Sequence, residues 1–197
     1  MDDSPILLIV LNGASSSGKT TIAHALLKVL EQPQIYTGLD DILERVQPFG
    51  PEHGDVFHRL ARPWRALWFQ RTDGRLKLFR QLHREVVAHY QIGKNIIVDT
   101  ALMDRRALLD AAECFAPLGG FLIGIKPPLE VSERWEAARG DRRPGHARAH
   151  YDLIHAHGIY DLVLDPSQIT PDECARVILN RVNGPAPDAF QRIIRNR

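Results

Sequence analysis

The chain has 197 residues, of which 44% are hydrophobic and 25% charged, a balance typical of one globular α/β domain with a substantial core. Its formal net charge of +1 gives no long-range field, which argues against a nucleic-acid-binding or membrane-surface protein. No apolar run approaches the roughly 20 residues of a membrane-spanning helix. The two cysteines, Cys114 and Cys174, lack metal-ligand spacing and are expected to be buried thiols.

The first predicted strand, residues 6–11, leads directly into GASSSGKT at residues 13–20, and helical periodicity follows over residues 19–30. This is the phosphate-binding P-loop pattern G-x-x-x-x-G-K-[ST] with the strand and helix that it requires, so a plain Gly/Ser-rich turn is disfavoured. The glycines let the backbone approach a phosphate, and successive N–H groups form an anion nest. Lys19 would reach the β- and γ-phosphates, and the Thr20 hydroxyl would ligate Mg²⁺.

We therefore expect ATP and Mg²⁺ as cofactors. The residues expected to bind ATP in this stretch are Gly13, Ser15, Ser16, Ser17, Gly18, Lys19, Thr20 and Thr21.

This strand also bears on localisation, because the acidic start MDDSPILLIV runs straight into the motif. A signal peptide could not be cleaved there without destroying the P-loop, so we expect a cytoplasmic protein.

Apolar runs alternate with helical stretches along the chain, which favours an α/β fold with a central parallel five-stranded sheet flanked by helices. We expect one kinase-like domain over residues 1–183, followed by a tail at 184–197 that frays or packs as a short helix. The expected strands are residues 6–11, 34–37, 95–98, 121–125 and 162–164. The expected helices are residues 19–30, 41–46, 75–91, 104–114, 129–138, 147–157 and 171–182.

Carboxylates follow the second and third strands, at the edge of the sheet where open α/β folds bind ligands. Asp99 ends the apolar run Ile96-Ile97-Val98 and is expected to hold Mg²⁺ or contact substrate, although an ordinary helix-capping Asp has the same pattern. Asp40 is the candidate base that orients an acceptor hydroxyl and takes its proton. Its neighbour Asp41 could also contact the acceptor, but it stands where a helix N-cap would.

An aromatic segment follows these carboxylates and forms part of an insert at about residues 47–80. Phe57, Trp64 and Trp68 either belong to the core or form the wall of an apolar acceptor pocket. The same segment carries Arg59, Arg62 and Arg65, which would suit an acidic acceptor.

A basic, glycine-containing run at residues 139–143 is flanked by predicted helices, and it indicates a mobile lid over about residues 139–147. Arg139 and Arg142 could bind phosphate oxygens and stabilise charge during phosphoryl transfer. The alternative is a solvated basic turn. Of the two histidines in the next helix, His157 is expected at its surface, whereas His155 could face the cleft.

Several segments together resemble the chloramphenicol phosphotransferase-like family of P-loop kinases, over nearly the whole chain to about residue 182. They are NGASSSGKTT at 12–21, GLD at 38–40, IIVD at 96–99, ARGDR at 138–142, IH at 154–155, YDLVLD at 160–165 and ECA at 173–175. The resemblance implies an adenylate-kinase-like fold that moves the γ-phosphoryl group of ATP to a hydroxyl of a small molecule, chloramphenicol in the founding case. It makes Asp40 the catalytic base, Lys19 the P-loop lysine and Arg139 and Arg142 the lid arginines. It also puts Pro166 in the segment that holds the adenine.

We therefore expect an ATP-dependent small-molecule O-phosphotransferase with a chloramphenicol-like acceptor. Such an acceptor suggests antibiotic resistance, but the sequence leaves open whether resistance is the biological role. Two alternatives stay open: a kinase of another metabolite, such as a sugar acid or nucleoside, and a non-catalytic ATP-binding regulatory module. Lid arginines and Asp40 argue against the second, since a binding module needs neither. The expected partners are ATP and the acceptor, and the sequence leaves the oligomeric state open.

Overall fold

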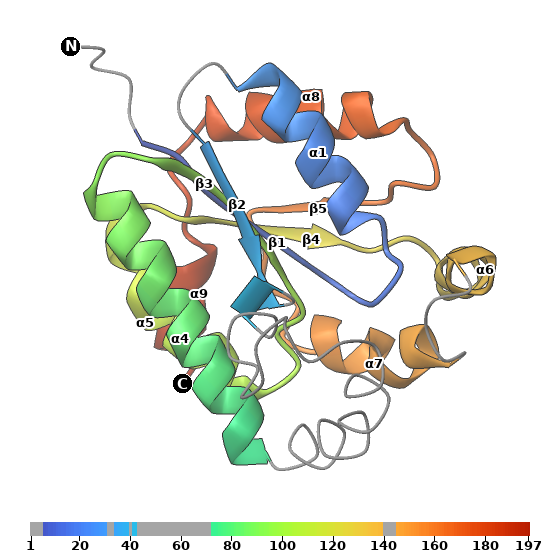
Figure 1. Ribbon diagram of the computed structural model, residues 1–197, viewed down its shortest axis with the longest axis horizontal. Coiled ribbons are helices and arrows are strands. Elements are labelled where there is room, and N and C mark those ends of the chain that lie inside the picture. Colours follow the sequence, from blue (N-terminus) through green and yellow to red (C-terminus); the bar gives the residue numbers. More distant parts are fainter. Residues whose placement is uncertain (1–5, 31–33, 40, 43–71, 140–144) are drawn as a thin grey trace, which may run out of the picture.

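A central sheet of five parallel strands organises the computed structural model, which describes residues 6–30, 34–39, 41–42, 72–139 and 145–197 (Figure 1). The strands follow the spatial order β2-β3-β1-β4-β5, so the predicted parallel five-stranded sheet is confirmed. They are β1 (Leu8–Gly13), β2 (Gln34–Gly38), β3 (Asn95–Thr100), β4 (Phe121–Ile125) and β5 (Leu162–Leu164).

Strand β1 lies in the middle of the sheet, paired with β3 on one side and β4 on the other. Every one of its residues is buried, which explains why the sequence there is a continuous apolar run and not an alternating one. Alternate side chains serve opposite faces: Leu8 and Val10 pack in one core cluster, and Ile9 and Leu11 in the other. The strand runs two residues further than predicted because Asn12 and Gly13 still pair with neighbouring strands.

Helices cover both faces of the sheet, as Figure 1 shows. Helices α1 and α8 pack together on one face, and α4, α5 and α9 cover the other. Helices α6 and α7 lie beyond the end of the sheet where β1 runs into α1. The helices are α1 (Lys19–Val29), α4 (Thr72–Gln91), α5 (Arg105–Phe115), α6 (Leu129–Arg139), α7 (His146–His155), α8 (Pro171–Val182) and α9 (Ala189–Arg195), with a short 3₁₀ turn, η2, at Ala116–Leu118. No helix among the described residues is both long and apolar enough to cross a membrane.

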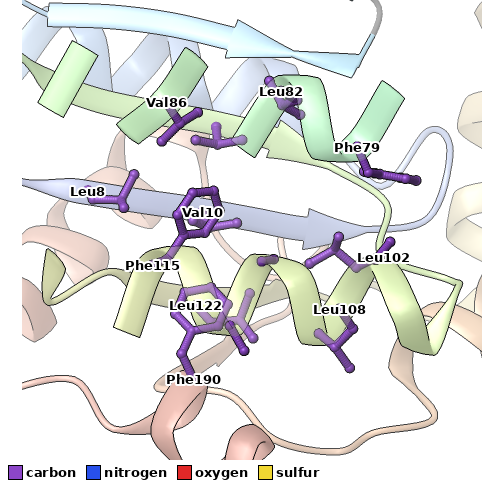
Figure 2. Packing of buried hydrophobic residues seen from close by; sticks show 14 of the residues in the cluster. Leu8, Val10, Phe79, Leu82, Val86, Leu102, Leu108, Phe115, Leu122 and Phe190 are labelled. Carbon is purple, nitrogen blue, oxygen red and sulfur yellow. The ribbon is translucent and has the colours of Figure 1, made fainter. Parts of the chain in front are cut away.

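The larger core cluster lies between the sheet and helices α4, α5 and α9 (Figure 2). Phe115 of α5 and Phe190 of α9 meet edge to face, with ring centroids 5.7 Å apart, an arrangement that aromatic rings favour. The chain after residue 183 therefore packs as a helix whose residues Ala189, Phe190 and Ile193 are buried. The cysteines are free thiols, Cys174 buried and Cys114 half-buried.

One polar pair crosses this core and joins α4 to α5. His83 is only 1% exposed, and its Nδ1 lies 2.5 Å from Oδ2 of Asp110, whose Oδ1 accepts a bond from Arg80 Nε at 3.2 Å. The hydrogen bond from His83 lowers the pKa of the Asp110 carboxyl below its ordinary value, and Arg80 adds to the effect. Because an ionised carboxylate can only accept, Nδ1 of His83 carries the proton.

We expect Asp110→Asn to lower the free energy of unfolding by about 2 kcal/mol at pH 7, because buried His83 loses its charged acceptor. The pKa of Asp110 is lower in the folded than in the unfolded chain, so this stabilisation is complete well above the unfolded value of about 3.9 and is lost as the pH falls below it. Urea titrations of both proteins between pH 7 and pH 2 measure the difference. Arg80→Gln, which removes a half-exposed partner, is the control and should cost under about 1 kcal/mol. A wild-type-to-variant difference that does not change with pH would contradict the assignment.

Candidate functional site

The loop between β1 and α1 can exist only with glycine at its first position. A Cβ on Gly13 would lie 2.5 Å from the carbonyl oxygen of Ile125 and 2.7 Å from Oγ of Ser17, which is closer than real Cβ contacts. Gly18, the N-cap of α1, has φ +91°, and Ser16 has φ +57°, a region that favours glycine and costs energy for other residues. The backbone N–H groups that open α1 meet no capping side chain and are suited to an anion.

Two hydroxyls in this loop are buried without a hydrogen-bond partner among the described residues. Ser16 is 8% and Ser17 1% exposed, and neither Oγ has a partner there. Buried polar groups are nearly always hydrogen-bonded, so we expect a ligand or a water molecule to bond these two hydroxyls. Phosphate oxygens accept such hydrogen bonds, so the loop fits a phosphate group.

The carboxylate of Asp99 in β3 is the meeting point of three side chains, two from α1 and one from β2. Oδ1 lies 3.6 Å from the Lys19 ammonium, while Oδ2 accepts hydrogen bonds from Thr20 Oγ1 at 2.9 Å and from Tyr36 OH at 3.1 Å. Lys19, 8% exposed, also donates to the carbonyl oxygen of Ala14 at 2.9 Å. The predicted partners Lys19, Thr20 and Asp99 are thus brought together, although they are up to 80 residues apart in sequence.

Tyr36 is the member of this group that the sequence reasoning missed. Its strand, β2, pairs with β3 so that Tyr36 lies opposite Ile97, two residues before Asp99. Burial and the negative charge of Asp99 raise the pKa of the Tyr36 hydroxyl above its ordinary value, which keeps it a hydrogen-bond donor. The available signal was a tyrosine in the short strand that precedes Gly38 and the Asp40-Asp41 pair.

Thr20 and Asp99 offer oxygen atoms of the kind that Mg²⁺ prefers. Mg²⁺ is usually held by one or two carboxylates together with phosphate oxygens and water, and these two residues lie beside the loop that fits a phosphate. The donor set of the site therefore fits Mg²⁺.

The end of β2 lies against β3, the strand that carries Asp99. A Cβ on Gly38 would lie 2.9 Å from the carbonyl oxygen of Asp99, so glycine permits the close approach there. Asp41 reaches back to accept a hydrogen bond from the Gly38 N–H at 2.7 Å, and its carboxylate closes the turn after the strand. Five residues predicted to belong to the site lie outside the described part of the chain, and their roles stay predictions: Asp40, Phe57, Trp64, Trp68 and Arg142.

A buried carboxylate joins the two helices on either side of the predicted lid. Glu136 of α6 is 4% exposed and accepts hydrogen bonds from the N–H groups of Gly145 and Ala147, at 2.7 and 2.9 Å. It thereby caps the N-terminus of α7, where a negative charge is favoured. Arg139, a predicted lid arginine, is the last residue of α6 and is exposed.

Two apolar side chains lie beside Gly18, the N-cap of α1. A Cβ on Gly18 would lie 3.7 Å from both Pro166 and Trp135. The segment that carries Pro166 is fixed by Asp165, whose Oδ1 accepts bonds from the Ser167 N–H at 2.9 Å and hydroxyl at 2.6 Å. Pro166 was predicted to contact the nucleotide, whereas Trp135 was not considered.

Comparison with known proteins agrees with this geometry. The sequence profile of the family described as chloramphenicol phosphotransferase-like protein matches residues 7–183. A Mycobacterium tuberculosis protein, provisionally named an O-phosphotransferase, is 30% identical over 200 residues, which cover 94% of this chain and 87% of the relative.

The solved structures that resemble this one include P-loop kinases. The M. tuberculosis APS kinase CysC, solved in complex with AMPPNP and APS, has a TM-score of 0.64 at 19% identity and covers 92% of this chain and 100% of its own. The Acinetobacter baumannii shikimate kinase, solved with shikimate, has a TM-score of 0.61 at 15% identity over 90% of this chain and 93% of its own. These likenesses establish the P-loop kinase fold that the sequence predicted.

We expect Glu136→Ala to lower the free energy of unfolding by about 1–2 kcal/mol, because two N–H groups at the start of α7 lose their cap. Glu133→Ala on the same helix is the matched control. Glu133 pairs with exposed Arg148 at 2.6 Å, and an exposed ion pair contributes little to stability because water screens it. Urea denaturation compares the two variants with the wild type. Equal losses would mean that the buried cap contributes no more than the surface pair.

Proposed function

This chain belongs to the chloramphenicol phosphotransferase-like family, and we propose that it transfers the γ-phosphoryl group of ATP to a hydroxyl of a small molecule. One observation carries the proposal: Lys19, Thr20 and Tyr36 converge on Asp99 beside a loop that fits a phosphate. A cation, a hydroxyl and a carboxylate at this spot are what phosphoryl transfer needs for positioning and for charge stabilisation.

On the donor side, the backbone of residues 13–18 and the orphaned hydroxyls of Ser16 and Ser17 bind the phosphates. Lys19 moves its ammonium from the Ala14 carbonyl and Asp99 to the β- and γ-phosphates, where it neutralises negative charge. Arg139 and Arg142 bind phosphate oxygens as the lid closes and excludes water, which would otherwise hydrolyse ATP.

Thr20 and Asp99 hold Mg²⁺ in this proposal, directly or through water. When bound there, the ion would neutralise negative charge on the phosphate groups. Tyr36 orients the Asp99 carboxylate through its hydrogen bond to Oδ2 and stays protonated, since both burial and Asp99 raise its pKa.

On the acceptor side, Asp40 orients the hydroxyl and takes its proton. In the sequence it comes two residues after Gly38, the last residue of β2, and Gly38 lies opposite Asp99. Phe57, Trp64 and Trp68 form the wall of a pocket for an apolar, chloramphenicol-like acceptor, and resistance to such a drug would be the biological role. Arg59, Arg62 and Arg65 in the same segment would instead suit a sugar acid.

The test is ADP release with and without a panel of acceptors that includes chloramphenicol, sugar acids and nucleosides. We expect ATP consumption to need Mg²⁺ and to rise with an aromatic, alcohol-bearing antibiotic. Stimulation by a sugar acid or nucleoside alone would keep the kinase and change its acceptor. Stimulation by no acceptor would favour a nucleotide-binding regulatory module.

We expect Asp40→Asn to reduce phosphoryl transfer at least about a hundredfold and to leave ATP affinity unchanged, because it removes the base but no nucleotide contact. Asp172→Asn, which changes an exposed carboxylate on α8, is the control and should leave both unchanged. Turnover of Asp40→Asn at the wild-type rate would show that Asp40 is not the base.

Trp135 and Pro166 lie together against Gly18, where their apolar surfaces suit the face of a purine. We expect Trp135→Ala to weaken ATP binding about tenfold, since base–aromatic stacking contributes about 1–3 kcal/mol, and to leave tripolyphosphate binding unchanged. Trp135→Phe, which keeps an aromatic face, should retain most of the affinity. Calorimetric titration measures both ligands. Equal loss for ATP and tripolyphosphate would remove Trp135 from the base site.

A further inference from the structure

A buried histidine at the end of α7 has one ring nitrogen in a hydrogen bond, and its other ring nitrogen has no partner among the described residues. His155 is the last residue of α7 and is 8% exposed. Its Nδ1 lies 2.8 Å from the hydroxyl of Tyr160. Its Nε2 is buried and has no hydrogen-bond partner within the described part of the chain. A buried polar atom left in this state needs an explanation.

The surrounding hydrogen bonds decide which nitrogen carries the proton. Asn12 Oδ1 accepts from the Leu102 N–H at 2.8 Å, which fixes the amide so that its Nδ2 donates to the Tyr160 hydroxyl at 3.0 Å. The proton of Tyr160 then goes to His155 Nδ1 at 2.8 Å or to the carbonyl oxygen of Ile154 at 3.3 Å. The shorter contact is near the optimum for a hydroxyl donor, and the longer one is weak. His155 Nδ1 therefore accepts, and Nε2 carries the hydrogen.

The charges around the imidazole favour an anion as the missing partner. Burial, Lys126, His157 and Lys19 all lower the pKa of His155, to about 4, and Asp152 opposes them only partly. The ring is therefore neutral at pH 7, and its Nε2–H is a donor in a region made positive by two lysines. A cation would be repelled there, whereas an anionic oxygen would be attracted.

The position of His155 ties it to the phosphate loop. Its network reaches Asn12, the residue that directly precedes Gly13, and Asn12 Nδ2 also lies 3.4 Å from the carbonyl oxygen of Ile154. Lys126 directly follows β4, whose residue Ile125 lies against Gly13. Lys19, the lysine of the loop itself, is close enough to affect the pKa of His155.

We propose that Nε2–H of His155 donates a hydrogen bond to a phosphoryl oxygen of the group bound at the P-loop, which gives the protein a phosphate-binding residue outside the loop. Tyr160 and Asn12 act as positioning residues, since they hold the ring in the tautomer that presents this hydrogen. The inference rests on the proposed function for its ligand, but it concerns binding of the anion and not turnover.

Two amide variants separate this role from a purely structural one. In His155→Gln the side-chain amide reaches the place of Nε2, and in His155→Asn it reaches only the place of Nδ1. We expect His155→Asn to weaken binding of tripolyphosphate about tenfold or more, because a hydrogen bond to a charged group is lost, and His155→Gln to stay within about threefold of the wild type. Melting temperatures of both variants check that they fold.

The opposite order, with binding kept by His155→Asn and lost by His155→Gln, would show that the ring acts only through Tyr160 and would overturn the proposal. Equal affinities, or equal losses, for the two variants would overturn it as well. The proposed function fails separately, if the wild type binds tripolyphosphate but no acceptor stimulates ATP consumption.

A measurement on the unmodified protein does not depend on the folding of variants. With ¹⁵N-labelled histidine at pH 7.5, we expect the resonance of His155 to report hydrogen on Nε2 and to shift on addition of tripolyphosphate, while His24 on α1 stays unchanged. Hydrogen on Nδ1, or no shift of the His155 resonance at saturating tripolyphosphate, would contradict the proposal.

Discussion

The close pairing of β1 with both of its neighbours is the constraint on which the candidate site depends. Leu11 lies opposite Asp99 in β3, and Gly13 lies opposite Ile125 in β4. The first register puts the Asp99 carboxylate beside Lys19, which begins the helix after the loop. The second leaves no room for a side chain on Gly13. A shift of either register by one residue would turn every side chain to the other face and separate the charges of the site.

Hydrogen bonds orient two side chains of the site, Asp99 and Asn12. Asp99 is fixed by Thr20 and Tyr36, and Asn12 is fixed by Leu102 and Tyr160. Preorganised groups of this kind contribute most to charge stabilisation because they need not reorganise during the reaction. The cost is visible in the loop, where Ser16 has a positive φ and two buried hydroxyls lack partners among the described residues. Such unsatisfied features are characteristic of binding sites, where a ligand supplies the missing contacts.

Helices α6 and α7 lie on either side of the segment that we propose closes over the site. Glu136 of α6 caps α7, so the two helices are joined by hydrogen bonds at the start of α7. The far end of α7 carries His155, whose ring is bonded to Tyr160 and through it to Asn12. Helix α7 therefore runs from the segment predicted to be a lid to a hydrogen-bond network that includes Asn12, the residue before Gly13.

The sequence by itself determined the elements whose signals are local. The P-loop could be predicted because its glycines, lysine and threonine all lie within residues 13–20. They have to lie close together in the sequence, since a single loop of backbone surrounds the phosphate. The parallel sheet could be predicted because strands that are buried on both faces have apolar side chains throughout. Trp135, Tyr36 and the His155–Tyr160–Asn12 network were decided only by the tertiary structure. Their partners are between 5 and 148 residues away, and strand order and helix packing, which no local pattern encodes, bring them into contact.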